Sequence, residues 1–167
     1  TFTVGLSSLS VNSRNISLGT STGTGTITND DAATVSINST ASVTEPNTGT
    51  TTISFTVTLS TTSDANVTVD YATADGTALT SDNDYTGIST TTLTFTPGQT
   101  SKTVNVTVNG DTKVELNETL TVNLTNLGVG GRNITMGNST GTGTITNNDS
   151  SVLSVTGFTV SESAGTA

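Results

Sequence analysis

The feature that most constrains this chain is an internal repeat. Residues 1–31 align without a gap on residues 119–149, and 20 of the 31 aligned positions are identical. The nonapeptide STGTGTITN occurs in both copies, at 21–29 and at 139–147. The offset of 118 residues is too long for one coil of a solenoid. It is typical of whole domains that follow one another in a tandem array.

The repeat divides the chain into three segments. We interpret residues 1–31 as the C-terminal part of one repeat, 32–149 as a complete repeat, and 150–167 as the N-terminal strand of the next. An isolated strand or pair of strands is at best marginally stable in water. We therefore expect both end segments to pack against neighbouring repeats of the same protein, or against other copies in a filament.

The composition of the chain predicts an all-β fold. Threonine accounts for 43 of the 167 residues, and β-branched residues favour strands. No segment keeps the apolar spacing of an amphipathic helix. Alternation and turn residues predict seven strands, at 33–44 (with a break), 51–59, 66–74, 91–96, 101–109, 119–125 and 139–147. This pattern predicts an immunoglobulin-like antiparallel β-sandwich with Greek-key connections.

The charge of the chain excludes some classes of partner. Thirteen Asp and Glu residues against four Lys and Arg give a net charge of −9. Nucleic acids require a cationic binding surface, so we expect no nucleic-acid partner. No run of 18 apolar residues is present, so we expect no membrane insertion in this segment. The threonine-rich, lysine-poor composition favours an extracellular or cell-surface location.

The sequence gives catalysis little support. It contains no His and no Cys, the most frequent general base and the thiol nucleophile of enzymes. A glycosidase can work with two carboxylates, but a sugar-binding cleft is usually lined by aromatic rings. Only 4% of the residues are aromatic. We therefore predict that the chain is not an enzyme and has no catalytic residues.

Most acidic residues of the complete repeat are predicted to meet at one pole. In a sandwich whose successive strands alternate in direction, the loops after the first, third and fifth strands share the pole at which the last strand ends. Eight acids lie at these places: Glu45, Asp75, Asp82, Asp84, Asp111, Glu115, Glu118 and Asp149. Neighbouring carboxylates repel one another unless a cation lies between them. Ca²⁺, which takes six to eight oxygen ligands, fits such a set.

Several motifs of the complete repeat resemble the Calx-beta domain family. They are YATADGTA at 71–78, DY at 84–85, LTFTPGQ at 93–99, Asp111, Glu115, ETL at 118–120 and GTITNND at 143–149. The motifs follow one another in order across the whole of 32–149. The resemblance implies a calcium-binding immunoglobulin-like sandwich, a domain of sodium–calcium exchangers, of an integrin and of large bacterial surface proteins.

The resemblance also implies which residues bind calcium. The ligand positions fall on Glu45, Asp75, Asp84 and Asp111, with Asp82 and Glu115 as second choices. Together with Asp149 these residues form the predicted metal site. We predict a structural calcium-binding module of an extracellular spacer, stalk or filament. An adhesin module that binds a ligand directly and a regulatory calcium-sensing domain are the alternatives.

Overall fold

The computed structural model describes residues 1–160, and residues 161–167 of the segment assigned to the next repeat lie outside the described residues. The chain splits into two compact units, Thr1–Asp31 and Ala32–Ala167. Within the described residues there is no helix, and so none that is long and apolar enough to cross a membrane.

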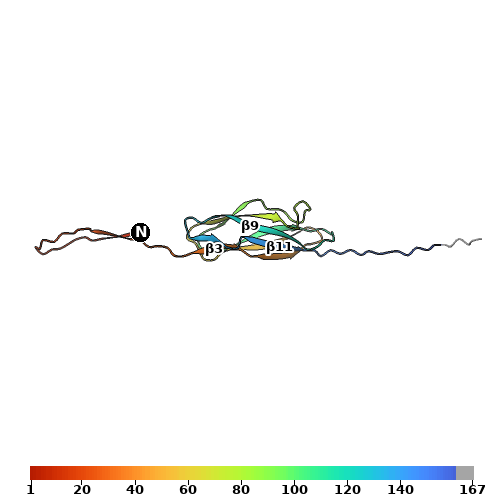
Figure 1. The fold of residues 1–167 in the computed structure, drawn as a ribbon, viewed down its shortest axis with the longest axis horizontal. Helices are drawn as coiled ribbons and strands as arrows, with labels where there is room; N and C mark the ends of the chain where they lie inside the picture. The colour runs from red at the N-terminus through yellow and green to blue at the C-terminus, as the bar shows by residue number, and fades with distance from the viewer. Residues whose placement is uncertain (161–167) are drawn as a thin grey trace, which may run out of the picture. The chain divides into compact units, whose positions relative to one another are not determined.

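The second unit is built from two β-sheets (Figure 1). Its strands are β3 (Ala33–Ile37), β4 (Thr40–Thr44), β5 (Thr50–Leu59), β6 (Val67–Asp75), β7 (Thr91–Phe95), β8 (Ser101–Asn109), β9 (Glu118–Gly128), β10 (Ile134–Met136) and β11 (Thr140–Thr146). One sheet has the order β10-β3-β5-β8, and the other has the order β4-β11-β9-β6-β7. The predicted all-β sandwich is therefore confirmed.

The first predicted strand is divided between the two sheets. β3 pairs with β5, whereas β4 pairs with β11 in the other sheet. Asn38 occupies the break between them. Its side-chain amide donates to Thr40 O at 2.6 Å, and its side-chain oxygen accepts from Thr56 N at 2.6 Å. The asparagine thus satisfies backbone groups that leave the strand ladder at this point.

Two strand pairings differ from the predicted antiparallel arrangement. β10 pairs with β3 in parallel, and β11 pairs with β4 in parallel. The first and last segments of the domain each change sheets and run side by side in the same direction. Sequence alternation does not predict β10, because three residues are too few to define an alternating pattern.

The core lies between the two sheets. Alternate residues of β5, β8 and β9 are buried, and Phe55 and Phe95 are the largest side chains that are fully buried. Glycines of β11 allow the sheets to approach closely. A Cβ atom on Gly141 would lie 2.8 Å from both the Phe55 ring and Asn38 O. These contacts explain why glycine alternates with threonine along this strand.

The first unit is a hairpin of β1 (Phe2–Gly5) and β2 (Thr22–Gly25). Phe2 is paired with Gly25, and the copy in the second unit pairs Leu120 with Gly143. Both members of the pair are shifted by 118 residues, so the two copies share one register. Among the described residues, no further strand pairs with the hairpin.

The loops at one pole of the sandwich are joined by backbone hydrogen bonds. Gly110 N donates to Gly49 O at 3.0 Å, which links the β8–β9 loop to the β4–β5 loop. Glu45 N donates to Thr146 O at 3.1 Å, which links the same region to the end of β11. The loops that carry most of the acidic residues therefore meet at this pole.

Candidate metal centre

Two groups of three carboxylates lie at the acidic pole. Glu45, Asp111 and Glu115 form the first group, and Asp84, Glu115 and Glu118 form the second. Within each group, one oxygen from each residue lies within 4.8 Å of the others. Two ligands of one Ca²⁺ ion, each ~2.3–2.6 Å from it, are at most about 5 Å apart. The spacing of either group is therefore compatible with a shared calcium ion.

Glu45 is the most deeply buried acid of the pole. Glu45 is only 5% exposed, and its Oε1 atom is buried without a hydrogen-bond partner among the described residues. Burial raises the pKa of Glu45, and the negative charges of Asp111 and Glu115 raise it further. A buried polar atom without a partner destabilises a fold. A bound cation would satisfy this oxygen.

Asp149 supplies a second buried oxygen beside the first group. Its Oδ1 atom accepts from Asn47 Nδ2 at 2.9 Å, but Oδ2 is buried and has no partner in the described part of the chain. The negative charge of Asp149 also raises the pKa of Glu45. Asn147 holds the turn in place, because its amide donates to Glu115 O at 2.9 Å and its Oδ1 atom accepts from Asp149 N at 3.0 Å.

Asp84 and Glu118 form a carboxyl pair in the second group. Asp84 is 7% exposed, and its Oδ2 atom accepts from Leu79 N at 2.7 Å. Burial raises the pKa of Glu118 to about 7, and its hydrogen bond with Asp84 contributes to the rise. When no metal is bound, the Glu118 carboxyl therefore keeps its proton to a higher pH than an ordinary glutamate does. A cation can replace that proton.

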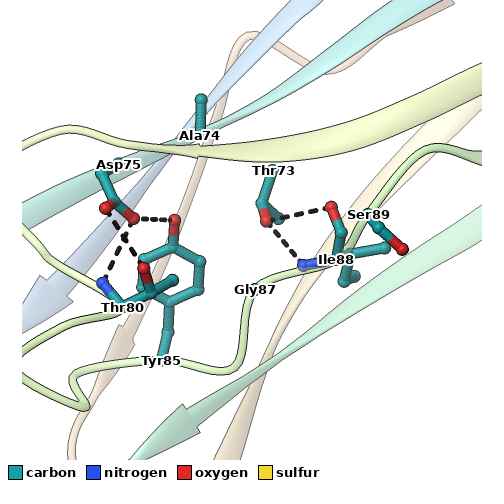
Figure 2. A pocket seen from close by; sticks show the side chains of 8 residues that line it. All are labelled: Thr73, Ala74, Asp75, Thr80, Tyr85, Gly87, Ile88 and Ser89. Atoms are coloured by element: carbon teal, nitrogen blue, oxygen red, sulfur yellow. Dashed lines mark hydrogen bonds between the residues drawn. The ribbon is translucent and has the colours of Figure 1, made fainter.

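Asp75 belongs to neither of the two carboxylate groups that the described residues form. Its carboxylate accepts from Tyr85 Oη at 2.5 Å and from Thr80 N at 3.2 Å. Figure 2 shows the Asp75 carboxylate facing both residues. The three residues line an open pocket of about 310 Å³. The hydrogen bond from Tyr85 holds the pKa of Asp75 below its usual value. The protein's own donors already satisfy this acid.

Asp82 is exposed and also lies outside both groups of the described residues. Its charge contributes to the raised pKa of Glu118 and of Lys113, which places it near the pole without making it part of a cluster. The two groups thus contain four of the seven predicted ligands, Glu45, Asp84, Asp111 and Glu115. Asp149 lies outside the groups of described acids, but its charge raises the pKa of Glu45.

Glu118 is the acid of the second group that the predicted ligand set omits. It is the first residue of β9 and shares the phase of Leu120 and Val122, which are both buried. Alternate residues of a strand face the same side of the sheet. The sequence signal for Glu118 is therefore that an acidic residue occupies an inward-facing position of a strand.

Comparisons with known proteins agree with the fold. Residues 28–151, which are more than half of the chain, match the family model of the Calx-beta domain. The apo-form Calx CBD1 domain is similar, with 23% identity and a TM-score of 0.57 over 70% of this chain and 98% of that chain. A comparison with curated proteins finds no match.

Two further solved structures are similar. The calcium binding domain CBD12 of CALX1.1 has 25% identity and a TM-score of 0.56, over 75% of this chain and 51% of that chain. The Calx CBD2 domain has 16% identity and a TM-score of 0.52, over 70% of this chain and 86% of that chain. The match thus spans about half of the CBD12 chain. On the strength of the family match, the chain belongs to the Calx-beta domain family.

Proposed function

We propose that the acidic pole of residues 32–149 binds calcium. The observation that carries the proposal is the pair of buried, unpartnered oxygens, Glu45 Oε1 and Asp149 Oδ2, beside clustered carboxylates. A donor set made only of oxygen suits a hard cation rather than zinc or copper. The similar structure named as a calcium binding domain supports the same ion.

The first group supplies the most complete set of ligands. Glu45, Asp111 and Glu115 would hold the ion, and the charge of Asp149 acts on Glu45 from nearby. Asp84 and Glu118, together with the shared Glu115, form a second position. A bound Ca²⁺ ion would neutralise charges that otherwise repel one another and would tie the three loops to the end of β11.

Calorimetry and thermal unfolding of the 167-residue chain test this site. Extracellular modules bind Ca²⁺ with a Kd of ~10⁻⁴–10⁻³ M. Millimolar calcium should then stabilise the domain by about 0.4–1.4 kcal/mol. Glu45→Gln should weaken binding strongly. Asp30→Asn is the matched control, because the equivalent position of the other copy is already Asn148.

The two variants should differ clearly in their affinity for calcium. We expect Asp30→Asn to bind calcium as the natural chain does, because Asp30 is exposed and lies in the first unit. No binding by the natural chain would contradict the proposed function. Unchanged binding by Glu45→Gln would show that the ion is not held by the first group.

We also propose that the module is a structural unit of an extracellular spacer, stalk or filament, without catalytic activity. The repeat of 20 identical residues in 31 at an offset of 118 supports a tandem array of similar domains. The turn that holds Asp149 is bonded to both the β4–β5 and β8–β9 loops. Calcium at this pole would therefore stiffen the segment by which the chain leaves the domain.

Neighbouring repeats are the partners that we propose for the hairpin and for the segment after β11. The hairpin unit exposes apolar side chains at positions whose copies form the core of the sandwich: Phe2, Val4, Leu6, Ile16 and Ile27. The segment after β11 also exposes Val152, Leu153, Val155, Phe158 and Val160. Strands of an adjoining repeat, or of another copy in a filament, would cover these side chains by β-augmentation.

Small-angle scattering tests the spacer role. Two copies of residues 32–149 joined directly would reproduce the period of 118 residues. A spacer predicts a longer and narrower distribution of interatomic distances in calcium than in chelator. A regulatory calcium sensor, suggested by the similar calcium binding domain CBD12, would instead change the angle between two equally rigid domains. Identical scattering in both solutions would contradict calcium-dependent stiffening.

A further inference from the structure

Lys113 places a positive charge inside the candidate calcium site. Its Nζ atom lies 3.3 Å from Glu115 Oε1 and 3.7 Å from Asp111 Oδ2. Both carboxylates belong to the group that contains the buried Glu45. Building on the calcium site proposed above, we infer that Lys113 is an intramolecular competitor of calcium. Its ammonium group neutralises these acids in the metal-free domain, and the ion must displace it.

The β8–β9 loop keeps Lys113 beside its partners. The backbone N–H of Lys113 donates to Asp111 Oδ1 at 2.8 Å, and this local turn brings residue 113 back toward residue 111. The Lys113 side chain is 52% exposed. A long side chain with an exposed charged end can move into solvent without disturbing the core. The loop therefore holds a counter-ion that is in place but can be displaced.

Binding of calcium and of the Lys113 ammonium group to the same two carboxylates is energetically unfavourable. An ion bound to Glu115 at ~2.3–2.6 Å would lie at most about 6 Å from an ammonium group bound to the same oxygen. The two cations repel one another at that distance and compete for the same lone pairs. Removing the lysine charge should therefore tighten calcium binding. Because exposed ion pairs are weak, we expect a decrease of about threefold to tenfold in Kd.

The chain contains a matched control for this substitution. Lys102 lies near the start of β8, and the acidic β8–β9 loop follows the far end of the same strand. Asn109 lies seven positions after Lys102 in this strand, which corresponds to about 23 Å. Lys102→Met removes the same charge as Lys113→Met, but far from the site. The pair therefore separates a local effect from a general change in net charge.

Calcium titration of the 167-residue chain by calorimetry tests the inference. Lys113→Met should lower the Kd by about threefold to tenfold, whereas Lys102→Met should change it by less than about twofold. Lys113→Arg keeps the charge and should stay close to the natural chain. Thermal unfolding in EDTA gives a second readout. Lys113→Met should lower the melting temperature there, so calcium affinity and metal-free stability should change in opposite directions.

Three results would overturn the inference. If the natural chain binds calcium and Lys113→Met binds it equally or more weakly, Lys113 does not compete with the ion. If Lys102→Met tightens binding as much as Lys113→Met, the effect is one of net charge. If neither the natural chain nor any variant binds calcium, the proposed site itself fails, and the competition fails with it.

Discussion

The two copies of the repeated segment have the same strand register but opposite burial. β1 and β2 pair as the equivalent parts of β9 and β11 do, residue for residue. Leu6 of the hairpin is nevertheless 61% exposed, whereas its copy Leu124 is 4% exposed. Ile27 and its copy Ile145 differ in the same way, at 81% and 2%. The repeated sequence forms the same strand pairing in both copies. Its apolar face is buried only in the second copy, where the other strands of the sandwich cover it.

This difference shows where the stability of the domain arises. A hairpin alone gains few apolar contacts, whereas the same residues inside two packed sheets lose nearly all contact with water. Substitutions at equivalent positions of the two copies should therefore have unequal effects on the cooperative unfolding of the sandwich.

The largest contrast is expected for leucine to alanine. Leu124→Ala removes a buried side chain and should destabilise the sandwich by about 2–5 kcal/mol. Leu6→Ala at the equivalent position should change it by less than about 0.5 kcal/mol, because Leu6 is exposed. Denaturant unfolding of the full chain, followed by circular dichroism, measures both. Equal losses in the two variants would show that the hairpin and the sandwich unfold as one unit.

A second contrast is expected for glycine to alanine. Gly141→Ala should destabilise the sandwich by about 1–3 kcal/mol, because the new methyl group would overlap the Phe55 ring and Asn38 O. Gly23 is the equivalent residue of the hairpin, and apart from Gly23 and its two chain neighbours no described residue comes within 4 Å of a Cβ atom built there. Gly23→Ala should therefore leave the melting temperature unchanged. A stable Gly141→Ala variant would mean that the sheets are less closely packed than the structure shows.

A smaller effect concerns the acidic pole, which only the complete repeat possesses among the described residues. The pKa of Glu45 is raised and that of Glu118 is raised to about 7, so the folded state binds more protons than the unfolded state above pH 4.5. Metal-free stability should therefore fall as pH rises from about 5 to 8. The lowered pKa values of Asp64, Asp70 and Asp75 act below pH 3.8, outside this window.

Thermal unfolding in chelator between pH 5 and 8 measures this slope. Calcium should reduce the slope, because the ion replaces the protons, and its stabilising effect should be larger at pH 8 than at pH 5. Glu118→Gln should flatten the metal-free slope. A melting temperature that rises with pH in chelator would contradict the raised pKa values at the pole.

Much of the fold could be predicted from the sequence because its signals are local. Alternation of apolar and polar residues predicts β5, β8 and β9, which are among the longest strands of the sandwich. The parallel pairings of β10 and β11 could not be predicted, because they depend on two distant segments that change sheets together.

The sequence predicts at which pole of the sandwich the acidic residues gather. It does not predict which of these acids belong to a carboxylate group. Strand parity brings the acidic loops together, but whether an acid faces the cluster depends on its neighbours. Asp75 is held away by Tyr85 and Thr80, an arrangement that no spacing indicates. Glu118 joins the cluster through the inward phase of β9.

Amide hydrogen exchange of the full chain, measured by NMR with and without calcium, tests the central claim most directly. The nonapeptide at 21–29 and 139–147 is identical, so its two copies differ only in their surroundings. We predict that calcium slows exchange at Asn147 and Asp149, whose N–H groups are hydrogen-bonded at the acidic pole, by about twofold to tenfold. Their copies, Asn29 and Asp31, should not change. Equal slowing in both copies, or in neither, would contradict a calcium site at this pole.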